Sequence, residues 1–233
     1  MPKNILITGA SRGIGRATAL ALAAPGVRLG LAARSAEALE TVAAACREQG
    51  AEALVLPYDV TAEPQVQRMA EAAAGSAGRI DMLVHSVGGA LVAPLGEISL
   101  ENWEASLRTL LTSTFLVVRQ TAPLMGQGGL IAAVLSVAAR QSFPGWSAYC
   151  AAKHGALGFL GAVREELRER GVRVTAVLPA ATDTELWDSV PGIWNRANML
   201  RPEEVAQAIA QLATYPPHMA VEELTVGHVA GRL

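Results

Sequence analysis

The sequence is poor in cysteine, lysine and aromatic residues, and it has no long uninterrupted apolar run. Its two cysteines, Cys46 and Cys150, are too few for a disulfide framework, which favours a reduced, cytoplasmic protein. No apolar stretch reaches the roughly 18 residues that a membrane-spanning helix needs. The first residues, Met1–Ile7, lack the long apolar core and the cleavage site of a signal peptide. We therefore expect neither export nor membrane insertion.

The charges are nearly balanced and are not gathered into blocks. The chain has 19 basic and 21 acidic residues and a formal net charge of −2 at pH 7. Without a block of like charge, nucleic acid and anionic membranes are not expected as partners. The four histidines show no metal-ligand spacing with either cysteine, so no metal is predicted. They are His85, His154, His218 and His228.

Short apolar runs alternate with alanine-rich amphipathic stretches along nearly the whole chain. The apolar runs predict strands over Asn4–Thr8, Val27–Ala33, Ala53–Pro57, Met82–Val87, Leu130–Leu135, Val172–Leu178 and Glu223–Val229. Most of these runs are continuous rather than alternating in polarity, as expected when both faces of a sheet are covered. The stretches between them predict helices over Gly13–Ala24, Ala36–Gln49, Pro64–Ala74, Glu101–Met125, Ala148–Arg170 and Glu203–Ala213. The pattern indicates an α/β fold, a doubly wound parallel sheet with helices on both faces.

No internal repeat, low-complexity tract or linker divides the chain, so residues 1–233 are interpreted as one domain. Its least regular stretch, residues 186–201, holds Trp187, Pro191, Gly192 and Trp194. This stretch is either a flap over a substrate site or an ordinary surface loop.

A glycine-rich turn, Thr8–Gly15, joins the first predicted strand directly to a helix. Glycines allow the tight turn and let a pyrophosphate approach the backbone, while the helix N-terminus offers free N–H groups and a partial positive charge. The strand–turn–helix context makes this pattern far more specific than three glycines alone. The turn therefore predicts a dinucleotide-binding domain.

The end of the second predicted strand indicates which dinucleotide is bound. NAD sites usually place an acid there to accept hydrogen bonds from the ribose, but this chain has Ala33 followed by Arg34. Arg12 lies in the glycine turn itself. Two guanidinium groups suit a 2′-phosphate, so NADP is predicted and NAD is less favoured, although Arg34 alone could also be a solvent-exposed loop residue.

Tyr149 and Lys153 are four residues apart at the start of a predicted helix, which places them on one face. A phenol has a pKa near 10, and a nearby ammonium together with a positive nicotinamide would lower it. Tyr149 is then a usable general acid or base. Only Lys3 and Lys153 are lysines among the 19 basic residues, which suggests a specific use for the second.

Together these residues resemble the short-chain dehydrogenase/reductase family, from about Lys3 to Glu185. Thr8–Gly15 is similar to the family's TGxxxGxG turn, and Tyr149 with Lys153 is similar to its YxxxK pair. Ser136 falls where the family's catalytic serine stands and would hold the substrate oxygen beside the phenol. The resemblance implies a Rossmann-like sheet of about seven strands in the order 3-2-1-4-5-6-7 and an oxidoreductase activity.

The resemblance also implies a set of site residues. Tyr58-Asp59-Val60 resembles the motif that contacts the adenine, and Leu178-Pro179 with Thr184 resembles the segment that contacts the nicotinamide carboxamide. The predicted cofactor-binding residues are Gly9, Ser11, Arg12, Gly13, Ile14, Gly15, Arg34, Asp59, Val60, Ser86, Gly88, Tyr149, Lys153, Pro179, Thr182 and Thr184. The predicted catalytic residues are Ser136, Tyr149 and Lys153.

Two positions depart from the family pattern. The family's NNAG motif reads His85-Ser86-Val87-Gly88, and His85 is either a proton-active group or a polar filler that steadies the end of the sheet. The family's catalytic asparagine falls at Leu110, counted from Trp103. That asparagine holds a helix distortion and an ordered water next to the lysine, and leucine is expected to do neither. We therefore expect a working enzyme with a slower or differently connected proton relay.

Two functions remain open from the sequence. The first is an enzyme that transfers hydride between NADP(H) and a small carbonyl or secondary-alcohol substrate, with Tyr149 as general acid or base. Its pocket rim would be largely apolar, which favours a hydrophobic or aromatic substrate; the rim is formed by Phe143, Trp146, Trp187, Ile193 and Trp194. The second is an NADP-binding sensor or scaffold that has lost turnover. The resemblance also implies a homodimer or homotetramer, assembled through helices near 101–125 and 148–170.

Overall fold

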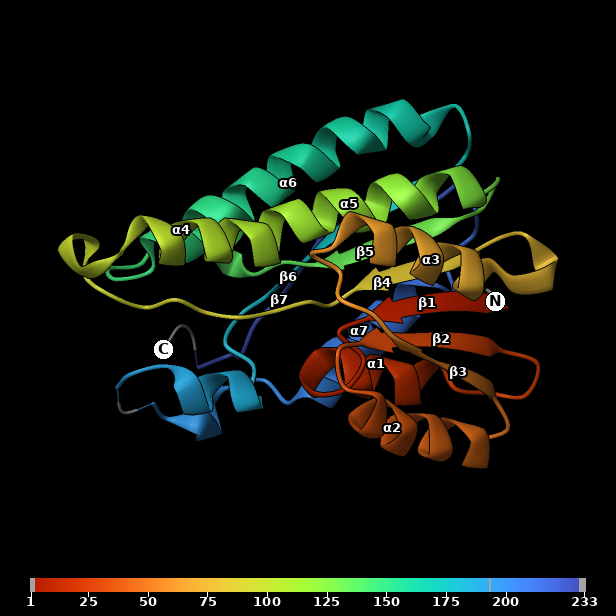
Figure 1. Ribbon diagram of the computed structural model, residues 1–233, viewed down its shortest axis with the longest axis horizontal. Helices are drawn as coiled ribbons and strands as arrows, with labels where there is room; N and C mark the ends of the chain where they lie inside the picture. The colour runs from red at the N-terminus through yellow and green to blue at the C-terminus, as the bar shows by residue number, and fades with distance from the viewer. Residues whose placement is uncertain (1–2, 193, 231–233) are drawn as a thin grey trace.

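Seven parallel strands form the centre of the protein (Figure 1). The computed structural model describes residues 3–192 and 194–230. The strands are β1 (Asn4–Thr8), β2 (Arg28–Ala33), β3 (Glu52–Pro57), β4 (Met82–His85), β5 (Leu130–Val134), β6 (Arg173–Pro179) and β7 (Glu223–Val226). They lie in the order β3-β2-β1-β4-β5-β6-β7, and each neighbouring pair is parallel. The expected strand order is confirmed.

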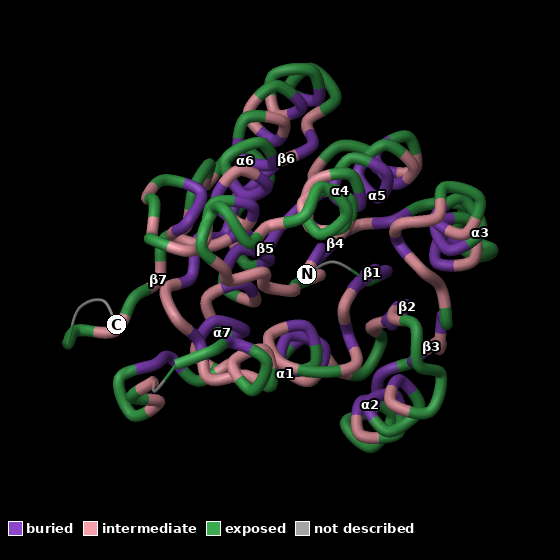
Figure 2. The backbone as a smooth tube through the Cα atoms, turned by 60° about the vertical axis from the view of Figure 1, so that its left-hand side comes forward, coloured by how far each residue is buried: buried purple, intermediate pink, exposed green. Residues whose placement is uncertain are grey.

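Helices cover both faces of this sheet, as Figure 2 shows. On one face lie α1 (Gly13–Leu22), α2 (Ala36–Glu48) and α7 (Pro202–Leu212). On the other face lie α3 (Glu63–Ala74), α4 (Leu100–Leu107), α5 (Ser113–Thr121) and α6 (Ser147–Arg168). The doubly wound α/β architecture is therefore confirmed. Within the described residues, no helix is long and apolar enough to cross a bilayer.

Short helical turns connect the longer elements. They are η1 (Gly75–Ala77), η2 (Leu95–Glu97), η3 (Arg108–Thr112), η4 (Ala122–Leu124), η5 (Val137–Ala139), η6 (Glu185–Ser189) and η7 (Arg196–Asn198). All are 3₁₀ turns except η3, which is π-helical. π-helical turns are rare and occur often at functional sites, so the position of η3 is informative.

Successive residues of the central strands pack against opposite helix layers. In β1, Ile5 and Ile7 join the apolar core that includes α1 and α2, whereas Leu6 joins the core beneath α3, α5 and α6. Every residue of β1 is buried. Two buried faces require apolar residues at neighbouring positions, which explains why the runs in the sequence are continuous.

The helix predicted over residues 101–125 is present and continuous over residues 100–124, but its helical type changes along its length. It is divided into α4, the π-helical turn η3, α5 and the 3₁₀ turn η4. Two strands end more than one residue earlier than predicted: β4 ends at His85 and β7 ends at Val226. The break at η3 contains Leu110 and lies beside the residues of interest below.

Candidate functional site

The glycine-rich turn lies where the carboxyl ends of β1 and β4 meet. Gly9 has a φ of +70°, and a Cβ atom there would lie 2.2 Å from the carbonyl oxygen of Ser86. A Cβ atom at Gly15 would lie 2.2 Å from the carbonyl oxygen of Gly9. Both neighbours are backbone atoms that cannot move aside, so glycine is required at positions 9 and 15.

The N-terminus of α1 is open to an anion. Arg12 occupies the N-cap position, its side chain makes no capping hydrogen bond, and the first turn has no acidic residue. The first amides of a helix have no partner within the helix, and they attract negative charge. Thr184 lies beside this turn, with its Cγ2 atom 3.1 Å from the place a Cβ of Gly13 would occupy. Ser11 and Ile14 are partly exposed in the same turn.

Two arginines stand exposed near this turn. Arg12 and Arg34 are both solvent-exposed, and no carboxylate among the described residues lies within ion-pair distance of either. Asp59 lies near enough to Arg34 that the guanidinium helps to lower the pKa of this carboxyl. The larger cause of the lowered pKa is the amide of Thr61, which donates to Asp59 Oδ1 at 2.8 Å. Asp59 thus has its own partner, which leaves Arg34 available to a ligand.

The start of α6 and the end of β5 bring three side chains together, those of Tyr149, Lys153 and Ser136. The Nζ atom of Lys153 lies 5.6 Å from the centroid of the Tyr149 ring. Lys153 is only 2% exposed, and its ammonium donates to the carbonyl oxygen of Val134 at 3.3 Å. Ser136 follows β5, and its hydroxyl interacts with the phenol. The structure therefore gathers the three residues that were predicted to be catalytic.

Burial changes the pKa of both titratable groups in this cluster. It raises the pKa of Tyr149 to about 12, and the Ser136 hydroxyl offsets only part of this effect. It lowers the pKa of Lys153 to about 8. The expectation that the ammonium and a positive nicotinamide together lower the pKa of the phenol concerns the cofactor-bound protein, and it stays a prediction. In the protein alone, the cost of burying a phenolate is the largest effect on Tyr149.

The remaining predicted cofactor residues lie at other strand ends on the same edge of the sheet. Pro179 is the last residue of β6. Just beyond it, the Thr182 hydroxyl donates to the carbonyl of Ala180 at 3.0 Å. Val60 is buried after β3. Ser86 and Gly88 follow β4, where Ser86 is half-buried and Gly88 is exposed. The structure thus places all the predicted residues along one edge.

A series of aromatic rings runs outward from Tyr149. The ring of Trp146 lies 5.3 Å from that of Tyr149, Trp187 lies 6.0 Å from Trp146, and Trp194 lies 4.9 Å from Trp187. The indole nitrogen of Trp187 donates to the carbonyl of Thr182 at 2.9 Å. The stretch that contains Trp187 and Trp194 is therefore packed against the start of α6. Ile193, also predicted to line the rim, lies outside the described residues.

The π-helical turn η3 contradicts one expectation about Leu110. We expected the helix distortion to be absent without an asparagine, yet η3 spans Arg108–Thr112 with Leu110 buried at its centre. Backbone and hydroxyl groups form the turn. The amide of Ser113 donates to the carbonyl of Arg108, and the hydroxyl of Thr114 donates to the carbonyl of Leu110 at 2.9 Å. The distortion does not depend on a polar side chain at position 110.

His85 is buried beneath this turn. It is 2% exposed, its Nδ1 atom lies 2.8 Å from the hydroxyl of Thr8, and its Nε2 atom lies 3.5 Å from the hydroxyl of Ser113. Burial and, secondly, the charge of Lys153 lower the pKa of His85 to about 3. Sequence reasoning missed Ser113, since no motif marks a serine that meets a histidine 28 residues away.

Other candidate groups do not join the cluster. Cys150 is buried, and His154 is exposed with its Nδ1 atom 2.9 Å from the carbonyl of Cys150. Within the described part of the chain, no group of three or more potential ligands could hold a metal ion.

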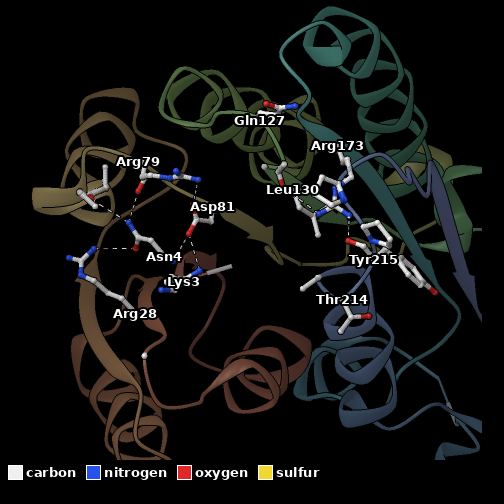
Figure 3. A pocket seen from close by; sticks show the side chains of 18 of the residues that line it. Lys3, Asn4, Arg28, Arg79, Asp81, Gln127, Leu130, Arg173, Thr214 and Tyr215 are labelled. Atoms are coloured by element: carbon white, nitrogen blue, oxygen red, sulfur yellow. Dashed lines mark hydrogen bonds and ion pairs between the residues drawn. The ribbon is translucent and has the colours of Figure 1, made fainter. Parts of the chain in front are cut away.

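A cleft of about 1020 Å³ lies at the opposite edge of the sheet, at the amino ends of the strands (Figure 3). None of the predicted site residues lines it. Its acidic and basic groups contact one another: Asp81 accepts hydrogen bonds from the amides of Lys3 and Asn4, and its second oxygen lies 2.6 Å from Arg79. These contacts fasten the start of β1 to the segment before β4.

Comparisons with known proteins find relatives that cover most of the chain. Residues 3–192 match the family model described as short chain dehydrogenase. The chain is 39% identical over 219 residues to a 3-oxoacyl-[acyl-carrier-protein] reductase of Synechocystis, covering 91% of this chain and 89% of that protein. It is 32% identical over 240 residues to a sepiapterin reductase of Chlorobaculum tepidum, covering 99% and 98% of the two chains.

Solved structures are similar over nearly their whole length. An alcohol dehydrogenase from the archaeon Thermococcus sibiricus, complexed with 5-hydroxy-NADP, has a TM-score of 0.91 and 30% identity, covering 99% of this chain and 98% of that one. A short chain dehydrogenase from Burkholderia cenocepacia in complex with NADP has a TM-score of 0.86 and 27% identity, covering 97% and 96%.

Proposed function

The chain belongs to the short chain dehydrogenase family, and on that premise we propose that it is an NADP(H)-dependent oxidoreductase of small carbonyl or secondary-alcohol substrates. The observation that carries the proposal is the meeting of Ser136, Tyr149 and Lys153 on the same sheet edge as the glycine turn. Nothing in the comparisons supports the alternative of a sensor or scaffold without turnover.

The residues at the first two strand ends fit NADP(H). The open N-terminus of α1 suits the pyrophosphate, and the unpaired guanidinium groups of Arg12 and Arg34 suit a 2′-phosphate. Asp59 already has hydrogen-bond donors of its own, so it does not compete for Arg34. The two solved neighbours described above, complexes with 5-hydroxy-NADP and with NADP, support the same choice.

Tyr149 is the proposed proton donor. With a pKa of about 12 the phenol is protonated at neutral pH, so it can give its proton to a carbonyl oxygen. In the reverse step, alcohol oxidation, the phenolate accepts the proton of the alcohol. The Ser136 hydroxyl holds the same substrate oxygen, and Lys153 supports the phenolate that remains. The nicotinamide, when bound, supplies or accepts the hydride.

The aromatic series indicates the substrate class. Trp146, Trp187 and Trp194 extend from Tyr149 with ring contacts of 4.9 to 6.0 Å, which leaves an apolar wall beside the phenol. Flat apolar surfaces stack favourably against indole rings. We therefore propose hydrophobic or aromatic ketones as the preferred substrates, with residues 186–201 as the flap that covers them.

The proposed assembly is a homodimer or homotetramer through α5 and α6. Phe115 of α5 is 39% exposed and packs edge-on against Phe159 of α6, with ring centroids 5.9 Å apart. An exposed phenylalanine supported by a partly buried one on the adjacent helix suits contact with a second copy. Light scattering measures the molecular mass directly, and a monomer at micromolar concentration would contradict the proposal.

Tyr149→Phe tests the proposed function most directly. The variant keeps the ring against Trp146 but removes the proton, so kcat should fall by about 10³-fold. The loss of NADPH absorbance is followed with a panel of ketones, dicarbonyls and alcohols, and NADPH binding is measured by calorimetry as the control. Unchanged turnover in Tyr149→Phe, or NADPH binding without any reaction across the panel, would overturn the proposal.

A further inference from the structure

The π-helical turn η3 is held by hydroxyl groups of α5. In an α-helix the amide of Ser113 would donate to the carbonyl of Thr109, but here it donates to Arg108, five residues back. The hydroxyl of Ser113 donates to the bypassed Thr109 carbonyl instead, at 2.6 Å. Ser113 and Thr114 are 0% and 1% exposed, so no bulk water competes for these bonds. The side chain of Ser113 thus compensates for the wide turn.

The proton positions of His85 follow from this arrangement. A serine hydroxyl has one proton, and Ser113 gives it to Thr109, so toward His85 it can only accept. The Nε2 atom of His85, 3.5 Å away, faces this acceptor, which favours the ring proton on Nε2. The Nδ1 atom is then an acceptor, and the hydroxyl of Thr8 donates to it at 2.8 Å. The ring is neutral, and both of its nitrogens are used.

This hydrogen-bonded chain connects the glycine turn with the surroundings of Lys153. Thr8 immediately precedes Gly9, and His85 pairs with Ala133 on β5, next to the Val134 carbonyl that accepts from Lys153. The turn η3 also packs on α6, where Leu111 Cδ2 lies 3.1 Å from the place a Cβ of Gly155 would occupy. Lys153 of α6 is the charged group whose field reaches His85. A shift of η3 would therefore move the helix that carries the lysine.

Resting on the proposed function, we propose that His85 and Ser113 are positioning residues that hold η3 and α6 so that the ammonium of Lys153 stays in place. They supply the polar support that Leu110 lacks. A neutral ring is essential to this role, because a second positive charge beside a buried ammonium would repel it. Both residues act through Lys153 rather than on the substrate.

The first test reads the ring of His85 in the unmodified protein. Nitrogen-15 spectra of histidine-labelled protein should show one ring with the proton on Nε2 that does not titrate between pH 5 and pH 9. Comparison with His85→Leu assigns the signal among the four histidines. A proton on Nδ1, or a titration near the ordinary pKa of histidine, would overturn the proposal, and neither result depends on turnover.

The second test reads Lys153 in Ser113→Ala. The chain has only two lysines, and Lys3 is exposed, so carbon-13 labelling of the lysine side chain resolves Lys153 without crowding. Its pKa should rise from about 8 toward the ordinary value, because a loosened turn admits water. With substrate, kcat should fall about 10-fold to 100-fold while KM for NADPH stays constant.

Thr121→Val is the matched control for Ser113→Ala. Thr121 is also fully buried on α5 and donates to a carbonyl four residues back, at 2.8 Å, but it does not touch His85. Both variants should lose similar thermal stability, and only Ser113→Ala should shift the titration of Lys153. An unshifted titration in Ser113→Ala, or an equal shift in Thr121→Val, would overturn the proposal. If the unmodified protein turns over no substrate, the proposed function fails while the ring proton and the lysine titration still decide this inference.

Discussion

The two ends of the parallel sheet carry similar residues but use them differently. At the amino ends, Asp81 is bonded to two amides and paired with Arg79, and Arg28 pairs with Glu52 at 3.1 Å. Arg173 donates to three carbonyl oxygens at 3.3 to 3.4 Å, although its Nε atom is buried with no partner among the described residues. Most of the polar groups at this end are therefore satisfied within the protein.

At the carboxyl ends, three basic groups have no carboxylate partner among the described residues, although Arg196 pairs with Asp183 and Asp188. Arg12 and Arg34 are exposed without an ion pair, and Lys153 is buried against a backbone carbonyl rather than a carboxylate. The 1020 Å³ cleft lies at the amino ends, whereas the residues proposed to act in chemistry lie at the carboxyl ends. If the proposed function is right, unpaired charge identifies the site better than the size of a hollow does.

Lys153→Met should have the largest effect, because it should greatly reduce kcat while it increases the stability of the fold. The lysine is 2% exposed and its pKa falls from 10.5 to about 8, which corresponds to a folding penalty of about 3 kcal/mol. Because the folded pKa lies below the unfolded one, the penalty is largest below pH 8 and shrinks as the pH rises toward 10.5. The variant should lose about 10³-fold in kcat. Its urea midpoint should exceed that of the unmodified protein, and this gain should be larger at pH 7 than at pH 9.5. Equal urea midpoints for both proteins at pH 7 would contradict this account.

Arg34→Ala should weaken NADPH binding by about 100-fold, because a charge-assisted contact with the 2′-phosphate is lost. NADH binding should stay the same, since NADH has no such phosphate. Arg79→Ala, at the amino ends, is the matched arginine control and should alter neither affinity. Calorimetric titration with both nucleotides decides the matter; a parallel loss for NADH would show that Arg34 does not select the cofactor.

Asp81→Asn should affect stability alone. Burial raises the pKa of Asp81, but its hydrogen-bond and charge partners outweigh this effect and hold the pKa below its usual range. These partners are the amides of Lys3 and Asn4 and the guanidinium of Arg79. The stability it contributes is present above its unfolded pKa and is lost as the pH falls through the lower folded pKa. The variant should unfold about 1–3 kcal/mol more easily at pH 7, with a smaller loss below pH 3 and unchanged kcat. Urea melts at both pH values measure this, and a reduced kcat would show that the two ends are coupled.

Leu110→Asn should have the smallest effect. The turn η3 already exists with leucine, so kcat should change by less than about threefold. Steady-state rates over a range of pH test this expectation. A large gain would mean that the hydroxyl groups of α5 do not replace the asparagine and that the proton relay limits the rate.

The sheet and the proximity of Tyr149 to Lys153 were predictable because their signals are local. Continuous apolar runs report two buried faces, and the four-residue spacing of Tyr149 and Lys153 fixes both on one side of a helix. The need for glycine at position 9 also follows from local backbone geometry.

The interior of the site was not predictable from local patterns. The distortion at η3 depends on Ser113 meeting His85 across the interior, and no short pattern encodes that contact. The raised pKa of Tyr149 also depends on burial, which the tertiary packing alone determines. An apolar residue at position 110 therefore gave a misleading signal about the helix that contains it.

The aromatic series gives the protein an intrinsic optical reporter. Three of its four tryptophans, Trp146, Trp187 and Trp194, stand in ring contact along the approach to Tyr149, whereas Trp103 lies apart on α4. Exchange of excitation among these neighbouring indoles, which are tilted against one another, makes their emission sensitive to any molecule that separates or covers them. Ligand entry beneath residues 186–201 should therefore be visible as a change in ultraviolet fluorescence without an added dye, and Trp103 would supply the constant background.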